Sequence, residues 1–244
     1  VWHAYEFSAL TESGIPVTRL LKLKYSCNSE FLIDSKSLKL YLNSFNMSKF
    51  GRCIDECLEI CRQIIEKDLS EALKTQVELS FLDNDCKKVQ IYNQFVNLFS
   101  QVNEKDIKAD SYSECPECLS VLPVDGVQEH YLTFDSLRSN CRVTHQPDFG
   151  DVFIYYKSKK RIEDVGLIKY LISFRSEFHF HEECCEMIYK RLSDLLDDGD
   201  KLFVSALYTR RGGIDISPVR SNCGFEIAQD LLDLSILARY GIKQ

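Results

Sequence analysis

The stretch Tyr41-Leu42-Asn43-Ser44-Phe45 organises the sequence, because it recurs 129 residues later as Tyr170-Leu171-Ile172-Ser173-Phe174. At the same offset, Ile33-Asp34 overlies Ile162-Glu163. A two-residue gap then aligns residues 55–57 with residues 182–184, and each of these segments opens a helical pattern. A repeat of this length indicates duplication of a structural unit. The sequence therefore predicts two related halves, residues 1–115 and 116–244.

Within each half, the hydrophobic periodicity changes in the same order. Alternating β-formers predict strands, and apolar residues three and four apart predict an amphipathic helix after them. Two such units predict an α+β protein in which helices pack on one face of antiparallel sheets, with a loop-rich link at residues 103–128. The expected strands are residues 17–25, 76–82, 151–156 and 201–208, and the expected helices are residues 54–66 and 185–196.

The composition narrows the class of protein. The 244 residues carry 30 Lys plus Arg and 37 Asp plus Glu, a net charge of −7, so we expect no binding to long nucleic acid. No apolar run approaches the roughly 18 residues of a membrane helix, and no leader opens the chain, so we expect a soluble, cytoplasmic protein without a membrane partner.

Because the first residue is Val1, we expect the natural polypeptide to begin further upstream. Eleven cysteines are an odd number, and their positions favour reduced thiols.

The first candidate site lies in residues 139–150, where Cys141 precedes Asp148 by seven residues. A thiolate is a strong nucleophile near neutral pH, and an acid brought close by a turn at Pro147 would exchange protons with the group that the sulfur attacks. The alternative is a buried cysteine in a loop. The polar neighbours Arg142 and His145 favour a reactive thiol.

The second candidate is residues 33–41, in which Lys36 and Lys39 flank hydroxyl side chains and follow Asp34. Two lysines suit an anionic ligand. The alternative is a solvated helix face or strand end, and only the recurrence of this segment in the repeat raises its interest.

The third candidate is residues 178–185, where His181 and Glu182 stand just before an apolar helical stripe. Zinc sites usually use a Cys-x-x-Cys or similar spacing, but Cys184 and Cys185 are adjacent and Cys185 belongs to the stripe. We therefore predict no metal here, and we expect His181 and Glu182 to face a ligand.

Two further segments give weaker evidence for a binding site. Residues 208–216 run through Arg210 and Arg211 into Gly212 and Gly213, a combination that suits a phosphate but also a basic hairpin tip. The pair Cys115 and Cys118 has the spacing of a zinc or thiol-exchange motif, but it lacks a second pair, so we favour a surface loop. The sequence contains no Gly-x-Gly-x-x-Gly or phosphate-loop motif.

These motifs together resemble those of the NADPH-dependent 7-cyano-7-deazaguanine reductases, the nitrile reductase or QueF family. The resemblance runs from Trp2 to Arg220 and is carried by residues 35–45, 139–148, 180–182 and 208–213. The two-half layout is similar to the bimodular branch, in which each half is a tunnelling-fold unit of antiparallel strands and two helices. The resemblance implies a homodimer and a role in queuosine biosynthesis, in which the substrate is a free base and tRNA enters only later.

The resemblance also implies roles for individual residues. Cys141 would attack the nitrile carbon of 7-cyano-7-deazaguanine to form a covalent thioimide, and Asp148 would donate the proton. Two successive NADPH molecules would then supply the hydrides that give 7-aminomethyl-7-deazaguanine. The implied substrate-binding residues are Ile33, Asp34, Ser35, His181 and Glu182, and the implied NADPH-binding residues are Ser35, Lys36, Arg211 and Gly212.

Two positions depart from the family pattern, and three other functions stay open. Asp34 stands where the family usually has Glu, so a substrate contact there would be longer, water-mediated or lost, and Phe149 stands where Trp is common. The alternatives are a zinc-dependent GTP cyclohydrolase, for which no metal set can be assembled from the sequence, an amidine-forming relative that uses ammonia, and a non-catalytic zinc or thiol module. The last would be organised by Cys115, Cys118, Cys184 and Cys185.

Overall fold

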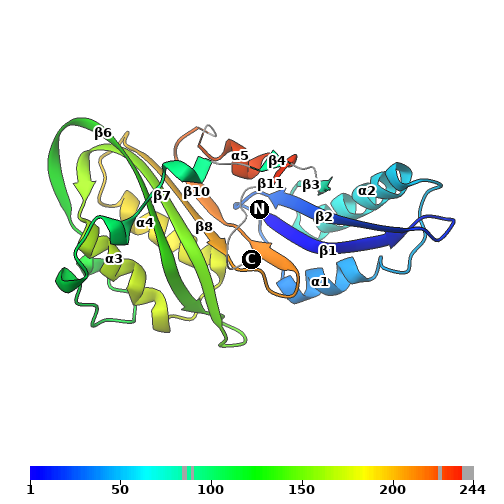
Figure 1. The fold of residues 1–244 in the computed structure, drawn as a ribbon, viewed down its shortest axis with the longest axis horizontal. Coiled ribbons are helices and arrows are strands. Elements are labelled where there is room, and N and C mark those ends of the chain that lie inside the picture. The colour runs from blue at the N-terminus through cyan, green and yellow to red at the C-terminus, as the bar shows by residue number, and fades with distance from the viewer. Residues whose placement is uncertain (84–86, 89–90, 225–226, 238–244) are drawn as a thin grey trace. The chain divides into compact units, whose positions relative to one another are not determined.

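The structure is a computed structural model that describes residues 1–83, 87–88, 91–224 and 227–237. The chain divides into two compact units, each with its own sheet and core (Figure 1). The first unit comprises residues 1–89, 210–216 and 230–244, and the second comprises residues 90–209 and 217–229. The predicted boundary between residues 115 and 116 stays a prediction.

The first unit is built on a four-stranded antiparallel sheet with the order β3-β2-β1-β9. Its strands are β1 (Trp2–Leu10), β2 (Pro16–Tyr25), β3 (Val77–Leu82) and β9 (Ile214–Ile216), and its helices are α1 (Ser35–Asn43) and α2 (Ile54–Leu73). Near the C-terminus lie α5 (Gln229–Leu232) and β11 (Ile236–Leu237), which pairs in parallel with β4 (Lys87–Lys88).

The two faces of the first sheet carry different residues. On one face, alternate side chains such as Trp2, Leu21, Leu23 and Leu79 pack with the apolar stripes of α1 and α2. This burial gives most of the hydrophobic stabilisation of the unit. The predicted helix at residues 54–66 is thereby confirmed, and it continues to Leu73.

The other face carries a polar row made of Asp215, His3, Lys22 and Ser80, which are paired across the four strands. His3 Nδ1 lies 2.6 Å from Asp215 Oδ1, and the buried Lys22 Nζ donates to the carbonyls of residues 233 and 236 at 2.7 and 2.5 Å. Burial lowers the pKa of Lys22 to about 8 although nearby aspartates oppose it. The backbone of residues 233–236 therefore satisfies the ammonium group of this row.

The second unit is built on a five-stranded sheet with the order β10-β8-β7-β6-β5, antiparallel except for the pairing of β5 with β6. Its strands are β5 (Val96–Asn97), β6 (Val121–Asn140), β7 (Pro147–Ile162), β8 (Lys201–Tyr208) and β10 (Val219–Ser221). Its α-helices are α3 (Asp164–Ser173) and α4 (His181–Ser193), and its short 3₁₀ helices are Ile91–Gln94, Leu98–Ser100, Glu104–Asp106, Pro116–Cys118 and Phe174–Ser176.

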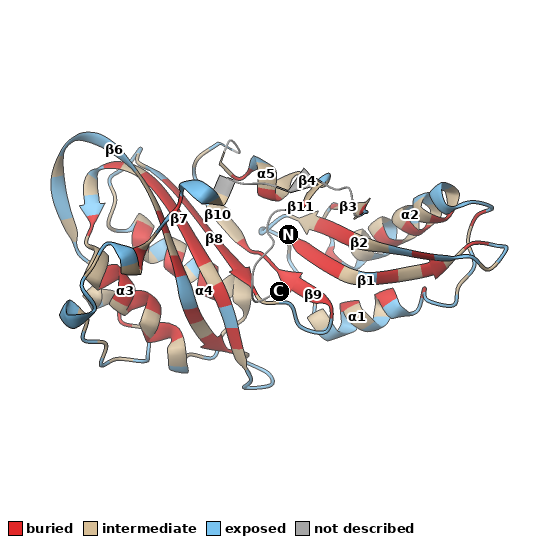
Figure 2. Cartoon of the chain, in the orientation of Figure 1, coloured by how far each residue is buried: buried red, intermediate tan, exposed pale blue. Residues whose placement is uncertain are grey.

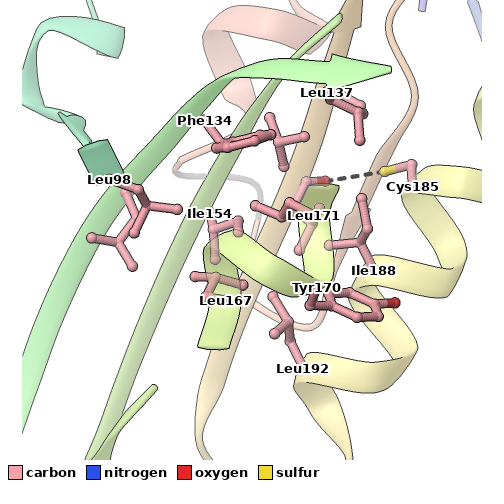
Figure 3. Packing of buried hydrophobic residues seen from close by; sticks show 14 of the residues in the cluster. Leu98, Phe134, Leu137, Ile154, Leu167, Tyr170, Leu171, Cys185, Ile188 and Leu192 are labelled. Carbon is pink, nitrogen blue, oxygen red and sulfur yellow. Dashed lines mark hydrogen bonds between the residues drawn. The ribbon is translucent and has the colours of Figure 1, made fainter. Parts of the chain in front are cut away.

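The core of the second unit lies between this sheet and its two α-helices. Figure 3 shows Phe134 and Ile154 from the strands packed with Leu171 of α3 and Ile188 of α4. The Cys185 thiol donates to the carbonyl of Val204 in the same core, at 3.7 Å. The central strands are buried along most of their length (Figure 2). Cys185 is thus a packing residue, as its place in the apolar stripe predicted.

The predicted α+β class with two related halves is confirmed, because both units run strand, strand, helix, helix, strand along the chain. The periodicity alone predicted only one helix in each half and missed α1 and α3. It also placed residues 103–128 in a loop-rich link, which is wrong from Val121 onward. Pro123 and Gly126 gave the turn signal, but β6 absorbs them where its register with β7 shifts between Pro123 and Gln128. In the described part of the chain, no helix combines the length and apolar character that crossing a membrane requires.

Candidate active site

Cys141 stands directly after β6, at the start of the short loop that leads into β7. Its N–H donates to the carbonyl of Gln146 at 2.8 Å, and its carbonyl accepts from the N–H of His145 at 2.9 Å. His145 completes the loop with a left-handed φ of 58°. The loop therefore holds the backbone of Cys141 on both sides while its side chain stays partly exposed.

The surroundings of the Cys141 thiol favour its ionised form. Burial pushes its pKa up, but hydrogen bonds from the side chain and backbone of Thr144 and from the backbone of Val143 outweigh this effect. The pKa of Cys141 is therefore lowered from the usual value of a thiol, although the charge of Asp148 opposes the shift. A lowered pKa together with partial exposure is typical of a reactive cysteine.

Asp148 lies on β7, and the β-ladder brings it close to Cys141. Asp148 pairs with Ser139 across the two strands, so it is opposite the residue two positions before the cysteine. Its side chain is buried, and it interacts electrostatically with the thiol. The hairpin thus converts a separation of seven residues in sequence into proximity in space. The turn that achieves this lies at residues 142–144 and not at Pro147, which is the first residue of β7.

The start of α4 is fastened to the end of β6. The N–H of Asn140 donates to the carbonyl of Glu177 at 2.8 Å, and the N–H of His179 donates to the carbonyl of Asn140 at 3.0 Å. His181, the first residue of α4, then places Nε2 3.3 Å from Oδ1 of Asp148. The second unit therefore brings Cys141, Asp148 and His181 together.

Glu182 and Glu183 are adjacent but have different surroundings. The carboxylate of Glu183 accepts from the N–H of Phe180 at 2.7 Å and pairs with Arg142 at 2.9 Å, so it caps α4 and ties the cysteine loop to the helix. Glu182 is partly exposed, and it makes no hydrogen bond or ion pair with any residue that the structure describes. Glu182 is therefore the carboxylate that is available to a ligand.

The cysteines considered as metal ligands do not form a site with other donors. Cys184 and Cys185 are buried, and burial raises the pKa of each thiol, to about 11 and about 12. Cys115 and Cys118 lie with their sulfurs 2.8 Å apart at a 3₁₀ turn, where the N–H of Cys115 donates to Ser173. Over the described ranges, three or more His, Cys, Asp or Glu side chains nowhere gather as a metal site would require.

In the first unit, Asp34 caps α1 rather than projecting freely. Its Oδ1 accepts from both the N–H and the hydroxyl of Ser37, each at 2.8 Å. These hydrogen bonds lower the pKa of Asp34. Around the cap, Ile33 and Ser35 are partly exposed and Lys36 is exposed. The second candidate segment is thus the beginning of a helix with a cationic exposed side.

The glycine pair of the fourth candidate segment forms a tight turn in the same unit. Gly212 and Gly213 have φ values of 57° and 81°, and the N–H of Arg211 donates to the carbonyl of Ile214 at 2.8 Å. A Cβ atom at Gly212 would lie 2.8 Å from Nζ of Lys39, so this lysine lies directly over the turn. Sequence reasoning named Lys39 but did not connect it with this turn, because 173 residues separate them.

Arg210 also belongs to this cationic group, which we define as Lys36, Lys39, Arg210 and Arg211. The guanidinium of Arg210 lies over the ring of Tyr5, 4.3 Å from its centroid. This contact holds the arginine without neutralising its charge. The first unit thus gathers the predicted NADPH-binding residues on α1 and at the glycine turn, whereas the predicted catalytic residues belong to the second unit.

Comparison with known proteins identifies the family. Residues 1–81 match the family model "Nitrile reductase, 7-cyano-7-deazaguanine-reductase N-term", and residues 147–226 match the model "QueF-like protein". The chain is weakly similar in structure to "archaeosine synthase QueF-Like in the apo form", with a TM-score of 0.35 and 15% identity over 41% of this chain and 96% of that one.

Curated relatives match along most of the chain. A protein of Legionella pneumophila (strain Corby) is 40% identical over 228 residues, which cover 92% of this chain and 76% of the relative. One of Bordetella avium is 38% identical over 234 residues, covering 95% and 81%, and one of Colwellia psychrerythraea is 37% identical over 226 residues, covering 91% and 76%. Each is named NADPH-dependent 7-cyano-7-deazaguanine reductase. The chain therefore belongs to the family of NADPH-dependent 7-cyano-7-deazaguanine reductases.

Proposed function

We propose that this protein reduces the nitrile of 7-cyano-7-deazaguanine to the aminomethyl group of 7-aminomethyl-7-deazaguanine, with NADPH, in queuosine biosynthesis. The observation that carries the proposal is the partly exposed Cys141, whose pKa is lowered and whose thiol interacts electrostatically with the buried carboxyl group of Asp148. Family membership supports the substrate and the cofactor, since the relatives carry both in their names.

The proposed first step is addition of the Cys141 thiolate to the nitrile carbon. A carbon–sulfur bond forms, one carbon–nitrogen π bond breaks, and the nitrogen takes a proton from Asp148, which gives a thioimide. Addition makes this carbon a better hydride acceptor than the nitrile carbon. His181, 3.3 Å from Asp148, would hold the carboxyl group in place and share the proton that it donates.

NADPH would supply two hydrides in succession, and breaking the carbon–sulfur bond between them would return the thiolate to Cys141. The residues that would hold this cofactor are Ser35, Lys36, Arg211 and Gly212, and we add Lys39 because it lies over the glycine turn. Without a side chain, Gly212 leaves the backbone open to a phosphate beside the ammonium of Lys39. An arginine fork and two lysines supply the positive charge that a dinucleotide phosphate requires.

Glu182 would recognise the substrate through hydrogen bonds. The other predicted substrate contacts are His181, Ile33, Asp34 and Ser35. The carboxylate of Glu182 is free to accept hydrogen bonds from the N–H groups of the guanine-like ring. A ligand without these donors would leave the charge unpaired, which gives strong discrimination. For Asp34 we expect a weaker contact, because one oxygen already caps α1. The homodimer stays a prediction.

The experiment is to mix the protein with 7-cyano-7-deazaguanine and measure its intact mass. We expect an increase equal to the mass of the substrate, because addition releases no group, and we expect oxidation of two NADPH per nitrile. Cys141→Ala should abolish both signals. The matched control is Cys53→Ala, which removes an exposed free thiol and should leave both signals unchanged.

The same assay separates the other functions considered. If Cys141→Ala oxidises NADPH at the wild-type rate, the thioimide mechanism is wrong. An adduct that is released by ammonia as an amidine, without NADPH oxidation, would identify the amidine-forming activity instead. Near-stoichiometric zinc in the purified protein, with no adduct, would favour a metal-binding protein.

A further inference from the structure

The ring of Tyr208 lies between Gly150 and His181. Gly150 and Tyr208 are directly paired across β7 and β8, and a Cβ atom at Gly150 would lie only 3.1 Å from Cδ1 of the tyrosine. The Tyr208 ring also stacks on His181, with centroids 3.8 Å apart and planes inclined by 14°. The absence of a side chain at position 150 therefore lets the tyrosine lie flat beneath the histidine.

The histidine has few other restraints on the orientation of its ring. Its Nδ1 atom is buried and has no hydrogen-bond partner among the described residues, and its Nε2 atom lies 3.3 Å from Oδ1 of Asp148. A histidine that faces a carboxyl group is usually oriented by a hydrogen bond at its second nitrogen. Here that hydrogen bond is missing within the described structure, and the stacked tyrosine is the contact that fixes the plane of the ring.

The hydroxyl of Tyr208 is not suited to a role of its own in proton transfer. It is fully buried, its polar neighbour is the thiol of Cys184, and it has no partner at full hydrogen-bond geometry in the described part of the chain. Burial raises its pKa well above the usual value, so the phenol stays neutral. The functional part of Tyr208 is thus its ring.

We propose that Tyr208 is a positioning residue, whose ring, supported by Gly150, holds His181 with Nε2 toward Asp148. The proposal rests on the proposed function to the extent that Asp148 donates the proton during nitrile addition. The orientation of His181 by Tyr208 does not depend on bound substrate. This orientation can therefore be tested directly in the free protein.

The first test measures the ¹⁵N chemical shifts of the His181 ring by NMR in the free enzyme at one fixed pH. In the wild type, Asp148→Asn should change the chemical shift of Nε2, because this atom faces the carboxyl group of Asp148. In Tyr208→Leu, which removes the ring, the same Asp148→Asn change should leave the chemical shift of Nε2 unaltered. Tyr208→Phe keeps the ring and should restore the response.

The second test separates positioning from a general loss of stability. Tyr170→Leu removes another fully buried tyrosine of the same unit, whose hydroxyl points to Glu114 at 3.3 Å rather than to the site. Both leucine variants should unfold at lower temperature. Only Tyr208→Leu should lose kcat, by about 100-fold, the scale expected for a misplaced catalytic group, with a smaller change in KM for the nitrile.

The outcomes are distinct. If Tyr208→Leu retains the response of His181 to Asp148→Asn, or if Tyr170→Leu loses it equally, the positioning role is overturned. If the wild type forms no adduct with 7-cyano-7-deazaguanine, the proposed function fails, while the NMR measurement still decides whether Tyr208 positions His181.

Discussion

Helices α1 and α3 occupy equivalent positions in the two halves, yet they serve different purposes. Both begin after an acid at the same repeat offset: Asp34 accepts hydrogen bonds from Ser37, and Glu163 accepts from Val165 and Gly166 at 3.1 and 2.6 Å. Lys39 of α1 overlies Ile168 of α3, which is fully buried. Both halves thus keep the capping acid, while packing decides which helix carries lysines on its surface and which is buried.

The hairpin loops show the same divergence. In the first half, the loop between β1 and β2 is closed by its own polar groups, with the N–H of Thr11 donating to Ile15 at 3.0 Å and the hydroxyls of Thr11 and Ser13 2.9 Å apart. In the second half, the loop between β6 and β7 carries Cys141 and is tied to α4 through Arg142. One copy of the hairpin thus presents a partly exposed thiol, and the other is closed by hydrogen bonds among its own groups.

The largest expected difference between the two halves is at the start of the second helix of each half, where Glu182 is equivalent to Asp55 in the repeat. Glu182→Gln should weaken binding of the nitrile substrate by about 10- to 100-fold, because a hydrogen bond to a charged group contributes about 1.5–3 kcal/mol. Asp55→Asn makes the equivalent change in the first half and should have no effect. Calorimetric titration with 7-cyano-7-deazaguanine measures both. Equal effects of the two changes would contradict the assignment of the substrate contact to the second half.

A smaller effect is expected for the lysine that lies over the glycine turn. Lys39→Ala should raise KM for NADPH about fivefold, since an exposed ionic contact contributes up to ~1 kcal/mol. The effect should decline as salt concentration rises. Lys67→Ala removes an exposed lysine of α2 and is the matched control. A KM for NADPH that Lys39→Ala leaves unchanged at low salt would remove Lys39 from the cofactor site.

The smallest expected effects are on stability, and they concern the residues that cap the N-termini of α1 and α3. Asp34→Ala and Glu163→Ala should each lower the free energy of unfolding by about 1 kcal/mol, the usual contribution of an N-cap. The pKa of Asp34 is lower in the folded protein, so its contribution is complete above the ordinary titration range of aspartate and is lost as the pH falls through the folded value. Urea unfolding at pH 7 and at about pH 3 should therefore show a smaller Asp34→Ala difference at the lower pH. A difference that is the same at both values would show that the carboxylate does not cap α1.

Much of this architecture could be predicted from local patterns. The repeat, strands β2, β3 and β8, the central part of β7 and the amphipathic α2 follow from spacing, and the proximity of Cys141 to Asp148 follows from one turn. The periodicity missed α3 because a helix buried on nearly all sides has no polar face to reveal it. The contacts of Lys39 with Gly212 and of Tyr208 with His181 depend on tertiary structure, which spacing along the chain does not encode.

Strand β9 has a consequence for how the protein is made. It completes the first sheet by pairing with β1, yet it is translated more than 200 residues after that strand. The edge of β1 that β9 will occupy stays open while the ribosome synthesises strands β5 to β8 of the second sheet, and such late closure is slow. An exposed edge of this kind invites pairing with other chains, so the nascent protein depends on rapid completion, or on a chaperone, to avoid aggregation.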